Sequence, residues 1–190
     1  MTRLMLVDDE PNILSSLRRA LNAMPSDMFE GGLQVETFEF PMEALERARH
    51  SAFDLVISDY RMPLMDGVAF LEALRDVQPH IARLILSGYA DLGGMIGAIN
   101  RANISRFIAK PWDVLELEIA IRQALEHRNL LIENQTLADL VRVQKGQLSR
   151  SDQAMIEMER RFPGLTKVKR DANGAIDLDL TDIDESDLDP

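Results

Sequence analysis

The most constraining feature of this 190-residue chain is the alternation of short apolar runs with longer helical patterns from residue 1 to about residue 127. Each short run is typical of a buried strand, and each longer segment repeats apolar residues at the three-to-four spacing of a helix. Five such units predict an α/β fold, a doubly wound parallel sheet of five strands with helices on both faces. Strands are expected at residues 4–7, 33–38, 53–57, 83–86 and 106–109, and helices at residues 12–24, 41–49, 68–77, 92–99 and from 113 onward.

Acidic side chains stand at the ends of two of these strands. Asp8 and Asp9 follow the first strand, and Asp59 follows the third. Because ligands of parallel sheets bind at the carboxyl ends of the strands, we expect these three carboxylates to meet at one edge. Neighbouring buried carboxylates repel each other, and a hard divalent cation such as Mg²⁺ removes the conflict. The sequence therefore predicts a magnesium site at this edge.

A lysine and a serine are expected at the same edge, because Lys110 follows the fifth strand and Ser87 follows the fourth. A lysine ammonium suits a phosphoryl oxygen, and a carboxylate can attack phosphorus to form an acyl phosphate. In such a reaction, the metal and the lysine offset the charge of the transferring group. The combination of carboxylates, cation and hydroxyl predicts phosphoryl transfer onto the chain itself.

Four stretches of the chain resemble the receiver domains of two-component response regulators, and the resemblance covers residues 1 to about 127. The stretches are Val7-Asp-Asp-Glu-Pro11, Asp59-Tyr-Arg-Met-Pro-Leu-Met-Asp-Gly67, Leu86-Ser-Gly-Tyr-Ala-Asp91 and Arg106-Phe-Ile-Ala-Lys-Pro-Trp112. The resemblance implies a flavodoxin-like sheet with strand order 2-1-3-4-5. It is strongest to receivers fused to cyclic-dinucleotide phosphodiesterase domains, although this sequence holds no such domain.

The resemblance also implies the chemistry of the acidic edge. Asp59 would accept a phosphoryl group from a partner histidine kinase. Asp9, Asp59 and the carbonyl of Arg61 would bind Mg²⁺ directly, and Asp8 would act through a water molecule. Lys110 would contact the phosphoryl group, just before a cis peptide bond to the proline that follows.

Two further pairs of residues are expected to control the phosphorylated state. Ser87 and Phe107 match the switch pair of the family, in which the hydroxyl moves to the phosphate and the aromatic ring turns inward. Arg61 and Tyr89 each lie two residues beyond a site residue. Their bulk is expected to exclude the hydrolytic water and so to prolong the phosphorylated state.

The helical pattern that begins near residue 113 continues to about residue 145, and its composition suits a helix as far as residue 162. A coiled-coil seam is predicted within residues 128–162, and a homodimer with it. Packing of one long helix against its own domain stays open as the alternative. The seam positions are Leu130, Asn134, Leu137, Val141, Gln144, Leu148, Ser151, Met155, Met158 and Phe162.

The C-terminal part of the sequence is strongly acidic. Residues 171–190 hold eight acids and no Lys or Arg, whereas the rest of the chain carries 24 acids and 21 bases. An Asn-Gly pair at 173–174 between two alternating arms predicts a β-hairpin in the tail, with disorder as the alternative. Three units are therefore expected, a receiver domain at 1–127, the helical extension at 128–162 and an acidic tail at 163–190.

These observations limit the function. The chain has no cysteine, no signal-peptide pattern and no apolar stretch of membrane-spanning length, so we expect a cytoplasmic protein without a membrane partner. Residues 128–190 show no basic helix-turn-helix, so nucleic-acid binding is not expected.

The leading hypothesis is a response regulator whose output is contact with a downstream protein. That contact would use the face formed by the fourth helix, fifth strand and fifth helix, together with the dimeric extension. The alternative is a phosphorelay intermediate that passes its phosphoryl group to a histidine phosphotransfer protein. No enzymatic activity is expected beyond self-phosphotransfer and autodephosphorylation at Asp59.

Overall fold

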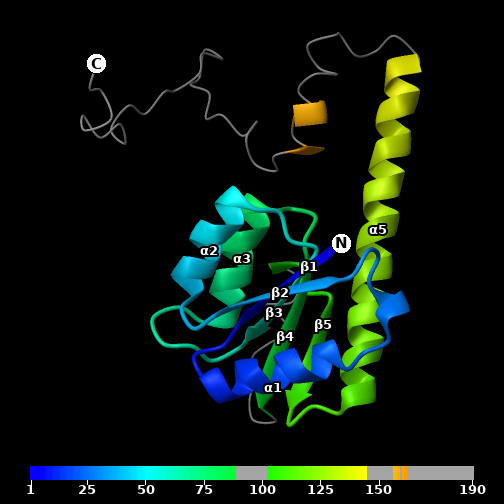
Figure 1. Ribbon diagram of the computed structural model, residues 1–190. Helices are drawn as coiled ribbons and strands as arrows, with labels where there is room; N and C mark the ends of the chain where they lie inside the picture. The colour runs from blue at the N-terminus through cyan, green and yellow to red at the C-terminus, as the bar shows by residue number, and fades with distance from the viewer. Residues whose placement is uncertain (89–101, 145–155, 159, 162–190) are drawn as a thin grey trace, which may run out of the picture.

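The computed structural model describes residues 1–88, 102–144, 156–158 and 160–161, in which strands and helices alternate along the chain (Figure 1). The strands are β1 (Thr2–Val7), β2 (Leu33–Phe38), β3 (Leu55–Asp59), β4 (Ala82–Gly88) and β5 (Arg106–Lys110). The helices are α1 (Pro11–Asn22), the short 3₁₀ helix η1 (Ser26–Met28), α2 (Pro41–His50), α3 (Gly67–Val77) and α5 (Val114–Gln144).

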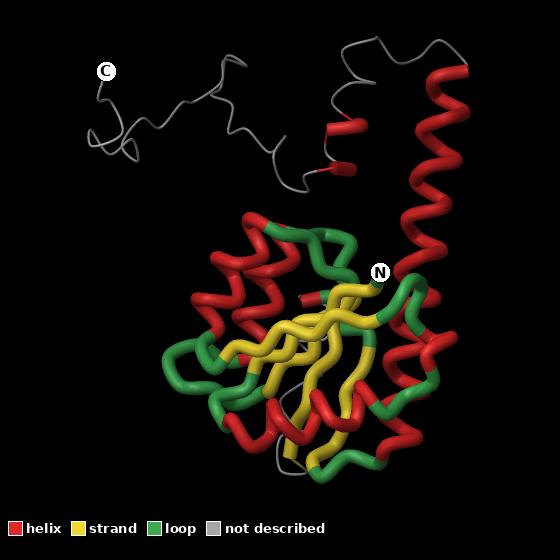
Figure 2. The backbone as a smooth tube through the Cα atoms, viewed as in Figure 1, coloured by secondary structure: helices red, strands yellow, loops and turns green. Residues whose placement is uncertain are grey.

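The five strands form one parallel sheet in the order β2-β1-β3-β4-β5. Figure 2 shows this sheet, in yellow, between helices on both of its sides. The strand order and the layers confirm the predicted flavodoxin-like α/β fold. This order places the carboxyl ends of β1 and β3 beside each other, which is the arrangement that the predicted acidic site requires.

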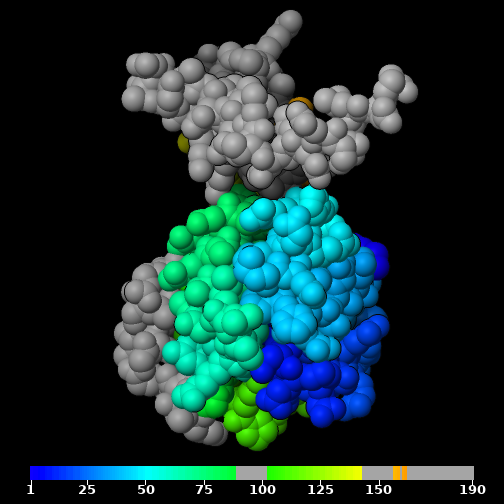
Figure 3. Space-filling view, turned by 90° about the vertical axis from the view of Figure 1, so that its left-hand side faces the viewer, coloured from blue at the N-terminus to red at the C-terminus, as the bar shows by residue number. Residues whose placement is uncertain are grey.

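The two faces of the sheet are covered by different helices, because successive side chains of a strand point to opposite faces. In β1, Leu4 and Leu6 pack in a core cluster with α1 and α5, whereas Met5 and Val7 pack in a cluster with α2 and α3. All four side chains are buried, and each contributes about 1.5–3 kcal/mol of hydrophobic stabilisation. Figure 3 views the molecule from the side of the second cluster, where α2 and α3 form much of the surface.

Local sequence signals set where the helices begin. Pro11 and Pro41 are the first residues of α1 and α2, where a proline loses no helical hydrogen bond. The helix α3 is capped by Asp66, whose side chain accepts a hydrogen bond from the backbone amide of Ala69 at 2.8 Å. This cap fixes the start of α3 directly after the loop that leaves β3.

The observed strands differ from the predicted ones mainly at their ends. The sequence predicts a third strand from Phe53, but the strand begins at Leu55, and the amide of Phe53 donates to the Gln78 side chain at 2.9 Å. The third, fourth and fifth strands each run further than predicted, to Asp59, Gly88 and Lys110. Site residues expected just after these strands therefore lie within them.

The helix α5 is 31 residues long and extends well past the sheet (Figure 1). Its first half packs on the sheet through Leu117, Ala120, Ile121, Ala124 and Leu125. Its second half exposes large apolar side chains, which are Leu130, Leu131, Leu137, Leu140 and Val141. No helix in the described part of the chain is long and apolar enough to cross a lipid bilayer.

Several predicted features lie outside the described residues. These are the helix at 92–99, the seam positions from Leu148 to Met155, Phe162, and the tail hairpin. They remain predictions.

Candidate functional site

The strand register brings the acidic residues of β1 and β3 together. Val7 pairs with Ser58, so the residues that follow them, Asp8 and Asp59, lie side by side at the edge of the sheet. On the other side of β3, the register continues through β4 to β5, where Gly88 pairs with Lys110. Three strands thus deliver two carboxylates and one ammonium to one place.

The ammonium of Lys110 lies between the two carboxylates. Its Nζ atom is 2.7 Å from Oδ2 of Asp8 and 2.5 Å from Oδ1 of Asp59. The Asp8 side chain is 1% exposed, that of Asp59 is 9% exposed and that of Lys110 is 20% exposed. The lysine therefore offsets the repulsion between two buried carboxylates and still reaches solvent.

Backbone amides bind the remaining oxygens of both carboxylates. The amide of Glu10 donates to Oδ1 of Asp8 at 2.9 Å, and the amide of Arg61 donates to Oδ2 of Asp59 at 2.8 Å. All four carboxylate oxygens thus have a donor. Such contacts hold the side chains in place.

The pKa values of Asp8 and Lys110 are both raised from their ordinary values. Burial raises the pKa of Asp8. The hydrogen bond from Lys110 lowers this pKa in part, and the negative charge of Asp59 raises it further. Burial by itself lowers the pKa of Lys110, but its hydrogen bonds to Asp59 and Asp8 outweigh that effect and raise it. Both shifts favour retention of protons, so the cluster would be stabilised by more positive charge.

The residues at this edge fit a hard divalent cation by charge and donor type. Asp8, Asp9 and Asp59 against Lys110 leave two negative charges, and carboxylate oxygens are the ligands that Mg²⁺ prefers. Asp9 is exposed, and the described residues contain no group of three converging metal-binding side chains. The structure thus gathers Asp8 and Asp59 and leaves Asp9 at the surface of the site.

Gly67 supports the site, although sequence reasoning assigns it no role. A Cβ atom on Gly67 would overlap the carbonyl oxygen of Asp59 and would lie 3.2 Å from the hydroxyl of Ser58. The Gly67 amide donates to the Tyr60 carbonyl at 2.9 Å, which fixes this close approach. The signal in the sequence is the Asp66-Gly67 pair, in which a helix-capping aspartate is followed by glycine, the amino acid that has no side chain.

The predicted switch and modulating residues occupy different environments. Ser87 is buried in β4 and pairs with Ala109, and Phe107 is half-buried against the cluster formed with α2 and α3. The predicted cis peptide bond between Lys110 and Pro111 is present. The side chain of Arg61 is exposed. Tyr89 lies outside the described residues.

Comparison with solved structures supports the fold. The chain is 41% identical to an uncharacterized protein from Neptuniibacter caesariensis, with a TM-score of 0.63 over 70% of this chain and 93% of that one. It is 34% identical to the signal receiver domain of an HD domain-containing protein from Pseudomonas fluorescens Pf-5, with a TM-score of 0.60 over 67% of this chain and 97% of that one.

Curated relatives and a family model show which family the chain belongs to. It is 31% identical over 169 residues to the hydrogenase transcriptional regulatory protein HoxA of Cupriavidus necator, covering 84% of this chain and 33% of that protein. It is 31% identical over 122 residues to the DNA-binding transcriptional regulator NtrC of Escherichia coli K12, which covers 64% of this chain and 24% of that protein. The chain thus spans about a quarter to a third of these relatives. The model of the response regulator receiver domain matches residues 4–122, and the chain belongs to this family.

Proposed function

We propose that Asp59 accepts a phosphoryl group from a partner histidine kinase in a reaction that uses Mg²⁺. The observation that carries the proposal is the position of Lys110, whose ammonium touches the carboxylates of Asp59 and Asp8 at 2.5 and 2.7 Å. A receiver domain implies a histidine kinase as partner. The buried, hydrogen-bonded carboxylate of Asp59 is the group best placed to act as nucleophile.

Each residue of the site has a different role in this phosphoryl transfer. A carboxylate oxygen of Asp59 forms a bond to phosphorus while the bond from phosphorus to the kinase histidine nitrogen breaks, and the histidine leaves with the electron pair. Lys110 offsets charge on the phosphoryl oxygens. Asp8, Asp9, Asp59 and the Arg61 carbonyl would hold Mg²⁺, which supplies further charge compensation when bound.

The phosphorylated state would be sensed by Ser87 and Phe107. Both belong to strands that run from the site into the sheet, Ser87 in β4 and Phe107 in β5. A shift of the buried Ser87 hydroxyl toward the phosphate would leave space that the half-buried ring of Phe107 can enter. Arg61 and Tyr89 would border the phosphoryl group and slow its hydrolysis. This response changes the surface of β5 and α5.

The output that we propose is protein contact through this surface and through a dimer of the extension of α5. Leu130, Leu137 and Val141 are exposed at the predicted seam positions on one continuous helix. Exposed apolar side chains in such a row favour burial against a second helix. The named curated relatives are transcriptional regulators, and contact with a protein target is our proposal for this chain.

Light scattering tests this output on the full chain. We expect beryllofluoride with Mg²⁺, which mimics the phosphoryl group, to change the mass or the dimer affinity of the wild-type protein. The same addition to Asp59→Asn is expected to have no effect, and Leu137→Glu is expected to weaken the dimer because it places a charge in the seam. A monomer under every condition would refute the dimer. Rapid return of the phosphoryl group to a histidine phosphotransfer protein would favour the relay alternative.

A further inference from the structure

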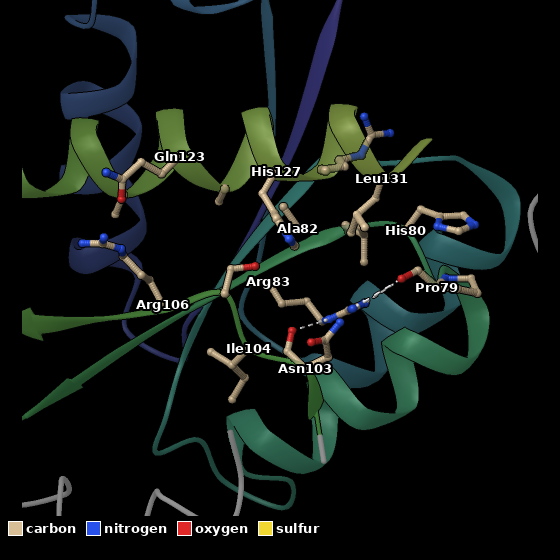
Figure 4. A pocket seen from close by; sticks show the side chains of 15 residues that line it. Pro79, His80, Ala82, Arg83, Asn103, Ile104, Arg106, Gln123, His127 and Leu131 are labelled. Carbon is tan, nitrogen blue, oxygen red and sulfur yellow. Dashed lines mark hydrogen bonds between the residues drawn. The ribbon is translucent and has the colours of Figure 1, made fainter. Parts of the chain in front are cut away.

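A second site lies at the opposite edge of the sheet, at the amino ends of β4 and β5. It is a pocket of about 400 Å³ between these strands, the loops that precede them and α5. Figure 4 shows His127 pointing from α5 toward the strands, with Arg106 and Gln123 at one end of the pocket and His80 at the other. The strand β4 separates this pocket from the acidic site by about 15 Å, at about 3.3 Å per residue.

The pocket, which we call the arginine pocket, is strongly basic. Its charged lining consists of Arg83, Arg106 and Arg128, with His80 and His127 beside them, and its lining contains no Asp or Glu. The chain as a whole has a net charge of -11. Three guanidinium groups around one cavity are therefore a local exception; that of Arg128 is paired with Asp54, and the remaining positive charge favours an anion.

Arg83 is the most unusual member of this group. It is 2% exposed, and its guanidinium donates to the backbone carbonyls of Gln78, Pro79 and Asn103 at 3.3–3.4 Å. These acceptors are neutral and the hydrogen bonds are long. Burial, reinforced by the nearby charge of Arg75, lowers the pKa of Arg83 to about 10. Buried charges are normally paired, so an anion in the pocket would supply the missing compensation.

Arg128 carries a second incomplete set of contacts. One of its terminal nitrogens lies 2.8 Å from the carboxylate of Asp54. Its Nε atom is buried and has no hydrogen-bond partner among the described residues. A buried donor without an acceptor is unfavourable, because it has lost its hydrogen bond to water. A ligand oxygen, or a water held with the ligand, would remove this cost.

The rest of the lining suits the organic part of a ligand. The lining also includes the buried apolar residues Ala82, Ile104 and Ala124. Asn103 and Gln123 carry amides that can both donate and accept hydrogen bonds. A cavity of this volume is of the size that holds a small organic molecule.

We propose that the arginine pocket binds a small phosphate-bearing organic anion of nucleoside-monophosphate size. Arginine forms paired hydrogen bonds to phosphate oxygens, which accounts for the three guanidinium groups. The apolar residues of the lining would contact a base or a similar ring, and Asn103 and Gln123 would bind its polar edge. This site does not use Asp59, so it stands independently of the proposed phosphorylation.

Nuclear magnetic resonance of the full chain, titrated with AMP, tests the proposal. We expect saturable shifts of the amides of Asn103 and Ser105 and of the Nε–H groups of Arg83 and Arg128. Inorganic phosphate and adenosine, each added alone, are expected to bind at least about tenfold more weakly, because each uses only part of the pocket. Equal binding of phosphate and AMP, or no saturable shift with AMP, would overturn the proposal.

Charge reversal locates the site. Arg106→Glu is expected to weaken AMP binding by about tenfold or more, because it removes a charge-assisted hydrogen bond and adds a repulsive charge. The matched control, Arg18→Glu on the exposed face of α1, should leave binding unchanged, and so should Asp59→Asn. Loss of binding in either control would refute this location.

The acidic tail is the competing occupant of the pocket. Residues 171–190 carry eight acids, and the described segment 156–158 and 160–161 lies near the pocket, since Ile156 and Arg160 share a neighbouring cavity with His80 and Arg128. A full-length variant with Asp177→Asn, Asp179→Asn and Asp182→Asn separates the two cases. If the pocket resonances of this variant match those of the wild type in the absence of AMP, the tail does not fill the pocket, which supports a small ligand as the occupant. Shifted resonances together with tighter AMP binding would show that the tail fills the pocket, which would overturn the proposal.

Discussion

Replacing Lys110 by methionine is expected to lower the free energy of unfolding by about 2–4 kcal/mol at neutral pH, near the range found when one partner of a buried ion pair is removed. The reason is that Asp8 and Asp59 would remain side by side without the ammonium that now touches both. Phosphorylation of Asp59 by a small-molecule donor is also expected to slow by about a hundredfold, since the loss of one charge-stabilising group in a transition state has that effect.

The loss of stability in Lys110→Met is expected to depend on pH in a defined direction. Lys110 lowers the pKa of Asp8 through its hydrogen bond, so its removal raises further a pKa that burial already holds above 3.8. The folded state of the variant then binds protons more tightly than the unfolded state. The loss of unfolding free energy in Lys110→Met relative to wild type is therefore largest above the raised pKa of Asp8, and it shrinks as the pH falls toward 3.8.

Urea unfolding at neutral pH and near pH 4 measures both effects. The control is Arg18→Met, which removes an exposed cation and is expected to change stability by less than about 0.5 kcal/mol at either pH. A deficit in Lys110→Met that matches this control, or one that is equal at the two pH values, would show that Lys110 does not hold the carboxylate pair.

The second large effect is expected for Gly67→Ala. On helix propensity alone, alanine at the start of α3 would stabilise the protein by up to about 1 kcal/mol. The structure predicts the opposite, because the new Cβ would overlap the Asp59 carbonyl oxygen, and backbone atoms cannot move aside without shifting β3. We expect a loss of about 3 kcal/mol or more, at the upper end of the cost of overpacking, and a slower phosphorylation of Asp59.

Gly32→Ala is the matched control for this substitution. Gly32 has a φ of +97°, and no atom lies within 4 Å of the position that a Cβ atom would take, so alanine there meets backbone strain without a clash. That strain is expected to cost about 1–2 kcal/mol and to leave phosphorylation of Asp59 unchanged. If Gly67→Ala proves no less stable than Gly32→Ala, the close approach of α3 to Asp59 does not constrain the site.

Much of the fold could be predicted from the sequence because burial and periodicity determine it directly. The apolar run at Leu4 to Val7 and the helical spacing of Leu14, Leu17 and Leu21 are both found in the core clusters, as expected. The strand ends are less accessible to such reasoning. Whether Ser87 lies within a strand or after it depends on pairing with β5, which no local pattern in the sequence reveals.

The candidate site could be predicted only in part, for similar reasons. Parallel strands place Asp8, Asp59 and Lys110 at one edge, and the structure confirms that they meet. The sequence could not show that Asp9 is exposed, because side-chain direction after a strand depends on the loop. Gly67 escapes sequence reasoning because its role depends on a clash with a residue eight positions earlier, which only the folded loop reveals.

The arginine pocket is also beyond sequence reasoning. Arg83 stands at the start of a strand, where a charged residue suggests an exposed end, yet it is among the most buried polar residues. Its guanidinium is held by backbone carbonyls of the loops before β4 and β5, at Gln78, Pro79 and Asn103, which no local pattern in the sequence reveals. Leu130, Leu137 and Val141 are exposed at predicted seam positions, whereas the exposed Leu131 and Leu140 lie outside the seam, and the partner of this surface remains a proposal.

The most direct test of the central claim is the mass of the intact protein after incubation with acetyl phosphate and Mg²⁺. We predict that the wild-type chain and the control Asp27→Asn each gain the mass of one phosphoryl group, because Asp27 is exposed and lies in η1, outside the acidic site. Asp59→Asn should gain none, since an amide cannot act as the nucleophile. Phosphorylation that persists in Asp59→Asn, or that maps to another residue in the wild type, would contradict the assignment of Asp59.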